Sequence, residues 1–239
     1  MAGGFEVFGL NGFKMGGTDF ANLVLYGKTV LTTGAFSVLG PGFDGSQYIG
    51  AVAVPKDGSV LRFYRPVSGD SHFLEQDGKL FSVNPGSQFE CYSFGPAVVS
   101  GGNEGIEFYR ESDQALTFSA TKPFLKLAGV FVDPTQHGVP EDPAAYPYSV
   151  STVFREGGRK FAYQFSNAHY HYRLVRPAGR SYNVSYNSVR MAFMTSAGQF
   201  HSRYVSRYMW THPWAHARVW EVPNRSAPQR MLIADVTGL

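Results

Sequence analysis

With 239 residues, the chain is long enough for one large domain or two smaller ones, each with a core of its own. Its 20 Phe, 14 Tyr and 27 Gly favour strands and tight turns over helices, and its one cysteine excludes a disulfide framework within the chain. No stretch approaches about 18 consecutive apolar residues, so we expect no transmembrane helix. The first residues lack the basic start and continuous apolar run of a secretory signal, so we expect the protein to be made in the cytoplasm.

The net charge of +3 hides an uneven distribution of charged residues along the chain. Residues 1–150 hold 9 Lys and Arg against 15 Asp and Glu, a balance of −6. Residues 151–239 hold 12 basic residues against 3 acidic ones, a balance of +9, and 11 of the 12 are Arg. Such an asymmetry predicts two units that have different neighbours.

The expected elements are short strands separated by turns. In chain order, we expect strands at residues 4–8, 23–31, 48–54, 60–64, 79–83, 89–94, 105–109, 116–119, 124–129, 149–154, 160–165, 169–175, 182–186, 189–194, 200–208, 216–222 and 230–236. The dipeptides Asp57-Gly58, Asp77-Gly78 and Gly157-Gly158 are typical of hairpin turns. Because no long segment shows a helical period, we predict an all-β fold of two β-sandwich-like units with essentially no helix.

The opening motif of the chain recurs in its middle. Gly4-Phe5-Glu6-Val7-Phe8 matches Gly105-Ile106-Glu107-Phe108-Tyr109 position by position, and residues 23–27 match residues 125–129. Self-similarity at a fixed spacing indicates that one structural unit occurs twice. We therefore divide the chain into a first β unit (1–103), a second copy of the opening motif with a Pro-rich linker (104–148), and an Arg/aromatic-rich β unit (149–239).

This opening motif resembles that of small tail-tip or baseplate-associated proteins of long-tailed bacteriophages, where it occurs at the N-terminus and again in mid-chain. The match covers residues 4–30 and 105–132, about a quarter of the chain, and it carries no catalytic residue over. The resemblance implies a structural protein of the virion tail, made in the host cytoplasm. It also implies that the partners are other tail or baseplate proteins and further copies of this chain.

A candidate contact site lies in and beside residues 204–220, which hold all three Trp. Trp, Tyr and Arg are enriched at the hot spots of protein interfaces, and Trp and Tyr also stack on sugar rings. The segment therefore fits subunit packing, binding of a host receptor or glycan, or a plain Trp-rich core. Nucleic acid fits least, because the basic residues are spread over many strands. The candidate contact residues are Arg203, Arg207, Tyr208, Trp210, Trp214, Arg218 and Trp220.

His169 and His171 are two residues apart, so both lie on one face of the strand expected there. Imidazole is a common metal ligand, but two ligands from one chain are too few for a complete shell. A metal ion would therefore have to lie on a symmetry axis between copies, as in the His-x-His elements of some phage fibre tips that this pair resembles. The alternative is two exposed histidines that alternate with packed tyrosines, in which case no cofactor is bound.

No arrangement of residues indicates catalysis. The last segment holds three carboxylates, Glu156, Glu221 and Asp235, too few to favour a glycosidase pair within it. We therefore expect a non-enzymatic structural protein of a phage tail tip or baseplate, which mediates assembly and has host attachment as a further candidate role. The alternative is a carbohydrate-binding, lectin-like β-sandwich module.

Overall fold

The computed structural model describes residues 6–8, 14–17, 23–37, 48–69, 71–96, 107–110, 113, 116–119, 122–133, 148–151, 154–165, 170–175, 183–212, 221–223 and 230–239. These ranges contain nineteen strands and no helix, which confirms the all-β prediction. The first strands are β1 Glu6–Phe8, β2 Lys14–Gly17, β3 Leu23–Thr32, β4 Gly34–Ser37, β5 Tyr48–Ala53, β6 Leu61–Ser68, β7 Phe73–Gln76, β8 Lys79–Ser82 and β9 Gln88–Pro96. The others are β10 Glu107–Tyr109, β11 Leu116–Ser119, β12 Leu127–Val132, β13 Tyr148–Ser151, β14 Phe161–Phe165, β15 Tyr170–Val175, β16 Asn183–Met194, β17 Gln199–His212, β18 Glu221–Pro223 and β19 Arg230–Asp235.

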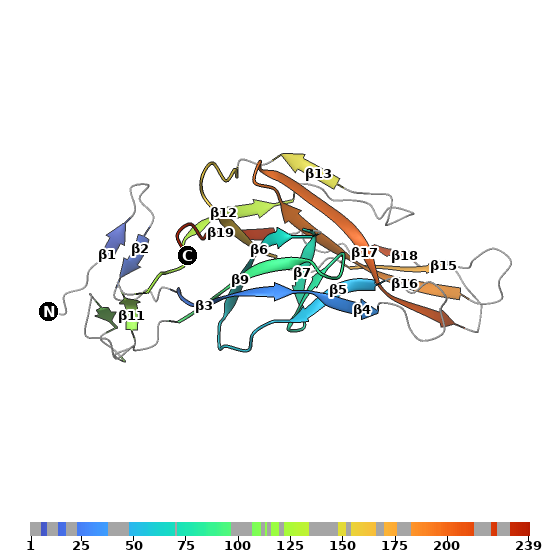
Figure 1. Cartoon of the computed structure of the whole chain (residues 1–239), viewed down its shortest axis with the longest axis horizontal. Coiled ribbons are helices and arrows are strands. Elements are labelled where there is room, and N and C mark those ends of the chain that lie inside the picture. The colour runs from blue at the N-terminus through green and yellow to red at the C-terminus, as the bar shows by residue number, and fades with distance from the viewer. Residues whose placement is uncertain are drawn as a thin grey trace.

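Two antiparallel sheets contain most of these strands (Figure 1). Sheet I has six strands in the order β12-β19-β14-β6-β9-β3. Sheet II has nine strands: seven follow the order β13-β17-β16-β7-β8-β5-β4, while β15 pairs with β16 and β18 pairs with β15. The strands that form each sheet therefore come from both halves of the sequence.

Each half of the chain contributes strands to both sheets, so the fold consists of two sandwich-like units placed edge to edge. The first unit, β3 to β9, supplies one end of each sheet, and the second unit, β12 to β19, supplies the other. The units meet at the seam, which we define as the junction of β6 with β14 in sheet I and of β7 with β16 in sheet II. Its register pairs are Tyr64 with Tyr163 and Ala192 with Phe73.

The two units also place their strands in the same chain order. Each begins with the outer strand of sheet I (β3 or β12) and continues with the outer strand of sheet II (β4 or β13). The seam strands follow (β6 and β7, or β14 and β16), then the strand beside the sheet II seam strand (β8 or β17). Last comes the strand of sheet I that lies between the outer strand and the seam strand (β9 or β19), while β5, β15 and β18 have no counterpart in this series. The division of the sequence into segments 1–103, 104–148 and 149–239 stays a prediction. β12 belongs to the middle segment and pairs with β19 of the last segment.

The repeated opening motif forms a small hairpin before each unit. β1 pairs with β2, and β10 pairs with β11, and both pairings are antiparallel. In each hairpin the register shifts before the third residue of the first strand, which is Phe8 in one and Tyr109 in the other. The same irregularity at matching positions supports the internal repeat that the sequence predicts.

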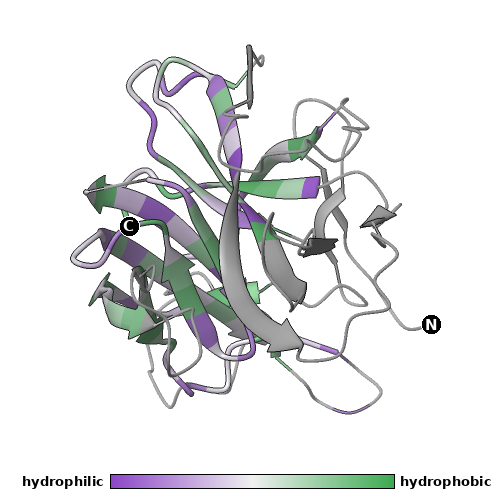
Figure 2. Ribbon diagram, turned by 90° about the vertical axis from the view of Figure 1, so that its right-hand side faces the viewer, coloured by the Kyte–Doolittle hydropathy of each residue, from purple (hydrophilic) through white to green (hydrophobic). Residues whose placement is uncertain are grey.

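The main core lies between the two sheets and crosses the seam. Its buried side chains include Tyr64, Phe73 and Phe89 from the first unit and Tyr163 and Ile233 from the second. Hydrophobic and hydrophilic residues alternate along several strands, as Figure 2 shows, because successive side chains point to opposite faces of a sheet. One continuous core therefore ties the two units together.

At one end of sheet I, the outer strand β3 also pairs with the segment that precedes β12, the outer strand of the opposite edge. The amide of Leu25 in β3 donates to the carbonyl of Pro123 at 2.8 Å, and the amide of Leu125 donates to the carbonyl of Leu23 at 2.7 Å. Lys126 separates residues 123–125 from β12. A second apolar cluster lies on the face of sheet I opposite the main core and includes Leu23, Leu25 and Leu125 beside the fully buried Phe63, Tyr92 and Phe94.

Of the three hairpin turns predicted from Asp-Gly and Gly-Gly dipeptides, one joins two paired strands and two do not. Asp77 (φ 50°) and Gly78 (φ 69°) form the two-residue turn between β7 and β8, where Gln76 pairs with Lys79, so this hairpin is confirmed. The hairpins expected at Asp57-Gly58 and at Gly157-Gly158 are wrong. Both dipeptides lie on a connection that leaves sheet II and enters sheet I, so the flanking strands do not pair with each other.

Candidate functional site at the seam

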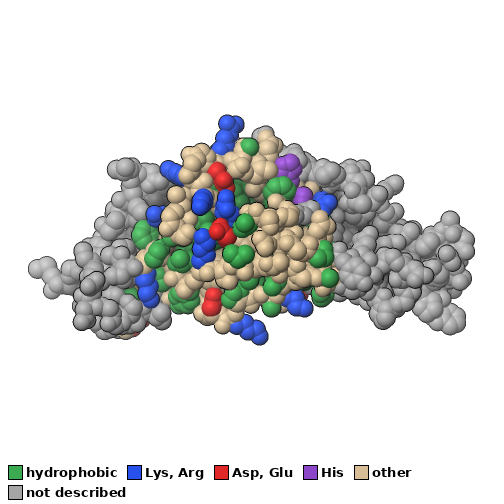
Figure 3. Space-filling model, in the orientation of Figure 1, with side chains coloured by type: hydrophobic (Ala, Val, Ile, Leu, Met, Phe, Trp, Pro, Cys, Tyr) green, Lys and Arg blue, Asp and Glu red, His purple; other side chains and the backbone are tan. Residues whose placement is uncertain are grey.

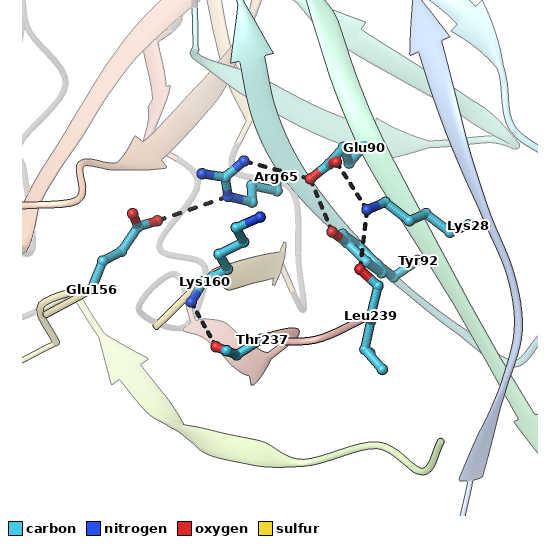
Figure 4. A network of polar contacts seen from close by, with 8 residues as sticks. All are labelled: Lys28, Arg65, Glu90, Tyr92, Glu156, Lys160, Thr237 and Leu239. Carbon is cyan, nitrogen blue, oxygen red and sulfur yellow. Dashed lines mark hydrogen bonds and ion pairs between the residues drawn. The ribbon is translucent and has the colours of Figure 1, made fainter. Parts of the chain in front are cut away.

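A row of charged side chains crosses sheet I from β3 to the loop before β14 (Figure 4). Lys28 Nζ lies 3.0 Å from Glu90 Oε1, and Arg65 Nη1 lies 3.5 Å from Glu90 Oε2. On the other side, Arg65 Nε lies 3.9 Å from Glu156 Oε1. Figure 3 shows basic and acidic side chains close together in the middle of this face of the molecule. Arg65 therefore lies between two carboxylates, one from each unit.

The electrostatics of this row favour the charged forms of Lys28 and Glu90. The hydrogen bond with Glu90 raises the pKa of Lys28 above its usual value. Burial alone would raise the pKa of Glu90, but hydrogen bonds from Lys28 and from the Tyr92 hydroxyl, the latter at 2.9 Å, outweigh burial and lower it. Both residues are thus fixed as ions at neutral pH.

A pocket of about 330 Å³ opens at the seam beside Arg65. It is lined by Arg65, Pro66, Ser71, Glu156, Tyr163, Phe193, Met194, Thr195 and Ser196. The first three of these residues come from the first unit and the other six from the second. Arg65 Nε is buried and makes no hydrogen bond, because the Glu156 carboxylate is too distant for one. The pocket therefore combines an ion pair, the aliphatic hydroxyl groups of Ser71, Thr195 and Ser196, and apolar side chains.

An aromatic stack borders the pocket at Phe193. The His72 ring meets Phe193 edge-on with centroids 4.7 Å apart, and the His201 ring stacks on Phe193 at 5.0 Å. Burial, with the nearby His72 as a second cause, lowers the pKa of His201, so its neutral form is favoured. These three rings come from both units and help to hold sheet II together across the seam.

The outer strands of sheet I present apolar side chains to solvent. On β12, the exposed fractions are 57% for Leu127, 51% for Val130 and 46% for Val132. On β3, Val30 is 56% exposed. β12 contains no charged residue and pairs with β19 on one side, and it ends the strand order of sheet I. An apolar edge strand of this kind is a template for pairing with another strand.

A buried ion pair joins Asp133, the residue that follows β12, to Arg190 on β16. Arg190 Nη1 lies 2.6 Å from Asp133 Oδ2, and the two side chains are 3% and 0% exposed. Arg190 also donates from Nε and Nη2 to Ser202 Oγ at 2.9 and 2.6 Å. This contact ties the residue after β12 to the two long strands β16 and β17 of the second unit.

The Arg/aromatic residues predicted as contacts fall mostly beyond what the structure describes. Arg203 is half-buried on β17 and opposite Met191 in register. The backbone of β17 also includes Arg207, Tyr208 and Trp210, but their side chains are not described. The register of β17 with β16 shifts at this point, since Ser188 pairs with Ser206 and Asn187 with Tyr208. The remaining predicted contacts, Trp214, Arg218 and Trp220, lie outside the described residues.

The predicted metal ligands are only partly described. His171 is on β15, where its Cα lies opposite Ser188 and Pro223, and His169 lies outside the described residues. Among the side chains that the structure describes, no group of three or more His, Cys, Asp or Glu could hold a metal ion. The metal site on a symmetry axis stays a prediction.

Sequence reasoning missed the seam pocket. Glu156 is one of three carboxylates in residues 151–239, but nothing in its sequence neighbourhood points to Arg65. The two residues belong to different units and meet through the pairing of β6 with β14. No local motif contains both, so a spacing rule could not have identified the site.

Comparison of the chain with protein-family models, with curated proteins and with solved structures gives no match. The described residues contain no helix that is long and apolar enough to cross a membrane. The strand order alone defines the class, which is an all-β protein of two joined sandwich-like units.

Proposed function

We propose that the chain is a non-enzymatic structural subunit of a phage tail tip or baseplate, which assembles with further copies of itself and with other tail proteins. The tail assignment comes from the repeated opening motif, whose two copies form matching hairpins. Assembly is supported by one observation above all, the uncharged and exposed edge strand β12. A role in host attachment belongs to the same proposal.

The occupant of this edge is a second copy of the chain, paired antiparallel through its own β12. Leu127, Val130 and Val132 would then meet the same apolar side chains of the other copy, and no charge would be buried, because β12 has none. The other outer strand of sheet I is less suitable. β3 presents one large apolar side chain, Val30, and its Lys28 is held by Glu90.

The test is the mass of the protein in solution, measured by light scattering after size-exclusion chromatography. The wild-type chain should be at least a dimer. Val130→Lys places a charge on the edge and should give a monomer with an unchanged circular dichroism spectrum. Val60→Lys is the matched control, because Val60 is 58% exposed and lies before β6 rather than on an outer strand, and it should behave as the wild type. A monomeric wild type, or a Val130→Lys variant that still associates, would contradict the proposal.

The lectin-like alternative is favoured by a different observation, the polar pocket at the seam. A stand-alone lectin would bind sugar as an isolated monomer and would not depend on β12.

A further inference from the structure

The seam pocket contains a gap between two charged groups that do not complete a hydrogen bond with each other. Arg65 Nε and Glu156 Oε1 are 3.9 Å apart, which is longer than a hydrogen bond, and Arg65 Nε has no other partner. A buried donor without a partner carries a cost that a suitable ligand or a bound water can remove. The missing partner must accept from the guanidinium and donate to the carboxylate.

We propose that this pocket binds one ring of a neutral sugar, with a pair of neighbouring hydroxyl groups that bridge Arg65 and Glu156 from the side of the pocket. A hydroxyl group both donates and accepts, so one oxygen can accept from Arg65 Nε while the neighbouring hydroxyl donates to Glu156. A protonated amine has no lone pair with which to accept, and an ionised carboxylate has no proton to donate. The inference concerns a separate surface from β12 and does not rest on the assembly proposal.

The charge of the pocket selects against ionic ligands. Arg65 and Glu156 are the two charged residues among its lining residues, and their charges cancel. An anion placed against Arg65 would also meet Glu90, which already lies 3.5 Å from Arg65 Nη1, and a cation placed against Glu156 would meet the guanidinium. A neutral polyol avoids both repulsions.

The walls of the pocket fit the remaining surface of a sugar ring. Phe193, which is only partly buried, offers aromatic surface for the C–H face of a pyranose, and Ser71, Thr195 and Ser196 offer hydroxyl groups around it. The volume of about 330 Å³ is at the lower end of the usual range for small-molecule sites, so it suits one ring rather than an extended oligosaccharide. Because the ligand must displace water, we expect a dissociation constant on the order of 1 mM for a free hexose.

The experiment is ligand-observed saturation-transfer NMR with free glucose, galactose and mannose, and with glucuronic acid and glucosamine as charged comparisons. At least one neutral hexose should bind the wild-type chain, and neither charged sugar should bind better. Glu156→Gln should weaken binding at least about fivefold, since a hydrogen bond to a charged group is lost. Asp77→Asn, at the β7–β8 turn and away from the pocket, is the matched control and should leave binding unchanged.

A second variant blocks the pocket without altering the ion pair. Ser196 is exposed and lines the pocket, so Ser196→Phe should abolish the signal while the unfolding temperature stays close to that of the wild type. The monomeric Val130→Lys variant should bind the sugar like the wild type, which separates this inference from the assembly proposal. The inference is wrong if no neutral hexose binds, if a charged sugar binds better, or if Glu156→Gln and Ser196→Phe bind as the wild type does.

Discussion

Tyr64 and Tyr163 pair across the junction of β6 with β14, and their side chains are 1% and 2% exposed. Burial raises the pKa of both phenols, so both remain protonated at any physiological pH. The Tyr64 hydroxyl donates to Glu75 Oε2 at 2.7 Å, which links the seam of sheet I to β7 of sheet II. The two tyrosines therefore join the units to each other and the two sheets to the same core.

We expect the two units to unfold together, because one core crosses the seam. Tyr163→Ala removes a large buried ring and should lower the free energy of unfolding by about 3–5 kcal/mol. Tyr163→Phe keeps the ring and is the matched control, with an expected loss of at most about 1 kcal/mol. The measurement is urea unfolding followed by circular dichroism and by Trp fluorescence. Two separate transitions in the wild type, or a loss confined to one of two transitions in Tyr163→Ala, would show that the units are independent.

Acid should destabilise the fold through Asp57 and Glu90. Burial alone would raise the pKa of Asp57, but hydrogen bonds from Ser59 and Ser93 lower it from 3.8 to about 2, and the pKa of Glu90 is also lowered. A carboxyl group whose pKa is lowered by folding stabilises the folded state fully at pH values above the pKa that it has in the unfolded chain. That stability is lost as the pH falls through the folded pKa. The free energy of unfolding should therefore decrease between about pH 5 and pH 2.

The variant Asp57→Asn separates the contribution of one carboxyl. It should lower the free energy of unfolding by about 1–2 kcal/mol at pH 6, and the difference from the wild type should shrink as the pH approaches 2, because the wild-type carboxyl is then protonated as well. Denaturant unfolding at several pH values measures this difference. A gap between variant and wild type that stays constant from pH 6 to pH 2 would contradict the assignment.

The Arg190–Asp133 pair should behave as a buried ion pair whose partners depend on each other. Asp133→Asn leaves the Arg190 guanidinium buried without its counter-charge and should cost about 3–5 kcal/mol. Arg190→Met should cost a similar amount, and it also removes the donor to Ser202. The double variant should cost less than the sum of the two single variants, as measured in a double-mutant cycle by urea unfolding. Strictly additive losses would mean that the pair is not coupled.

The sequence predicted the strand-rich class and the repeat because both depend on local information. Alternation of apolar residues and the matching motifs at residues 4–8 and 105–109 are visible in short windows, and the two hairpins form from neighbouring residues. The turn at Asp77-Gly78 was predicted correctly for the same reason, since its two strands are adjacent in the chain.

Pairing between distant strands could not be predicted in this way. An Asp-Gly dipeptide indicates that the chain turns, but not whether the next strand pairs with the previous one or crosses to the other sheet, as happens after Asp57. The seam pocket depends on such distant pairing, because Arg65 and Glu156 come together only when β6 lies beside β14. Exposure of the β12 edge is likewise a property of strand order, which the apolar composition of β12 does not reveal.

The last prediction concerns the Arg/aromatic segment, with its balance of +9 within residues 151–239. Such a charge requires negative groups nearby, and the balance of −6 in residues 1–150 is one source. Several of these acidic residues already pair with basic residues of the first unit. Asp57 and Glu75 pair with Arg62. Glu90 pairs with Lys28 and Arg65. Under the proposed role in a tail assembly, we therefore expect the segment to contact another subunit or a tail protein.

The double variant Trp214→Ala with Arg207→Glu tests this contact. It removes one apolar anchor, worth about 2 kcal/mol or more at a hot spot, and reverses one charge. It should therefore prevent assembly onto the particle while the isolated subunit keeps its circular dichroism spectrum and unfolding temperature. The matched control, Trp214→Phe with Arg207→Lys, keeps an aromatic ring and the charge and should assemble at least partly. If the first variant is incorporated into particles as efficiently as the wild type, the contact prediction is wrong, and a host-facing role for this segment becomes the better explanation.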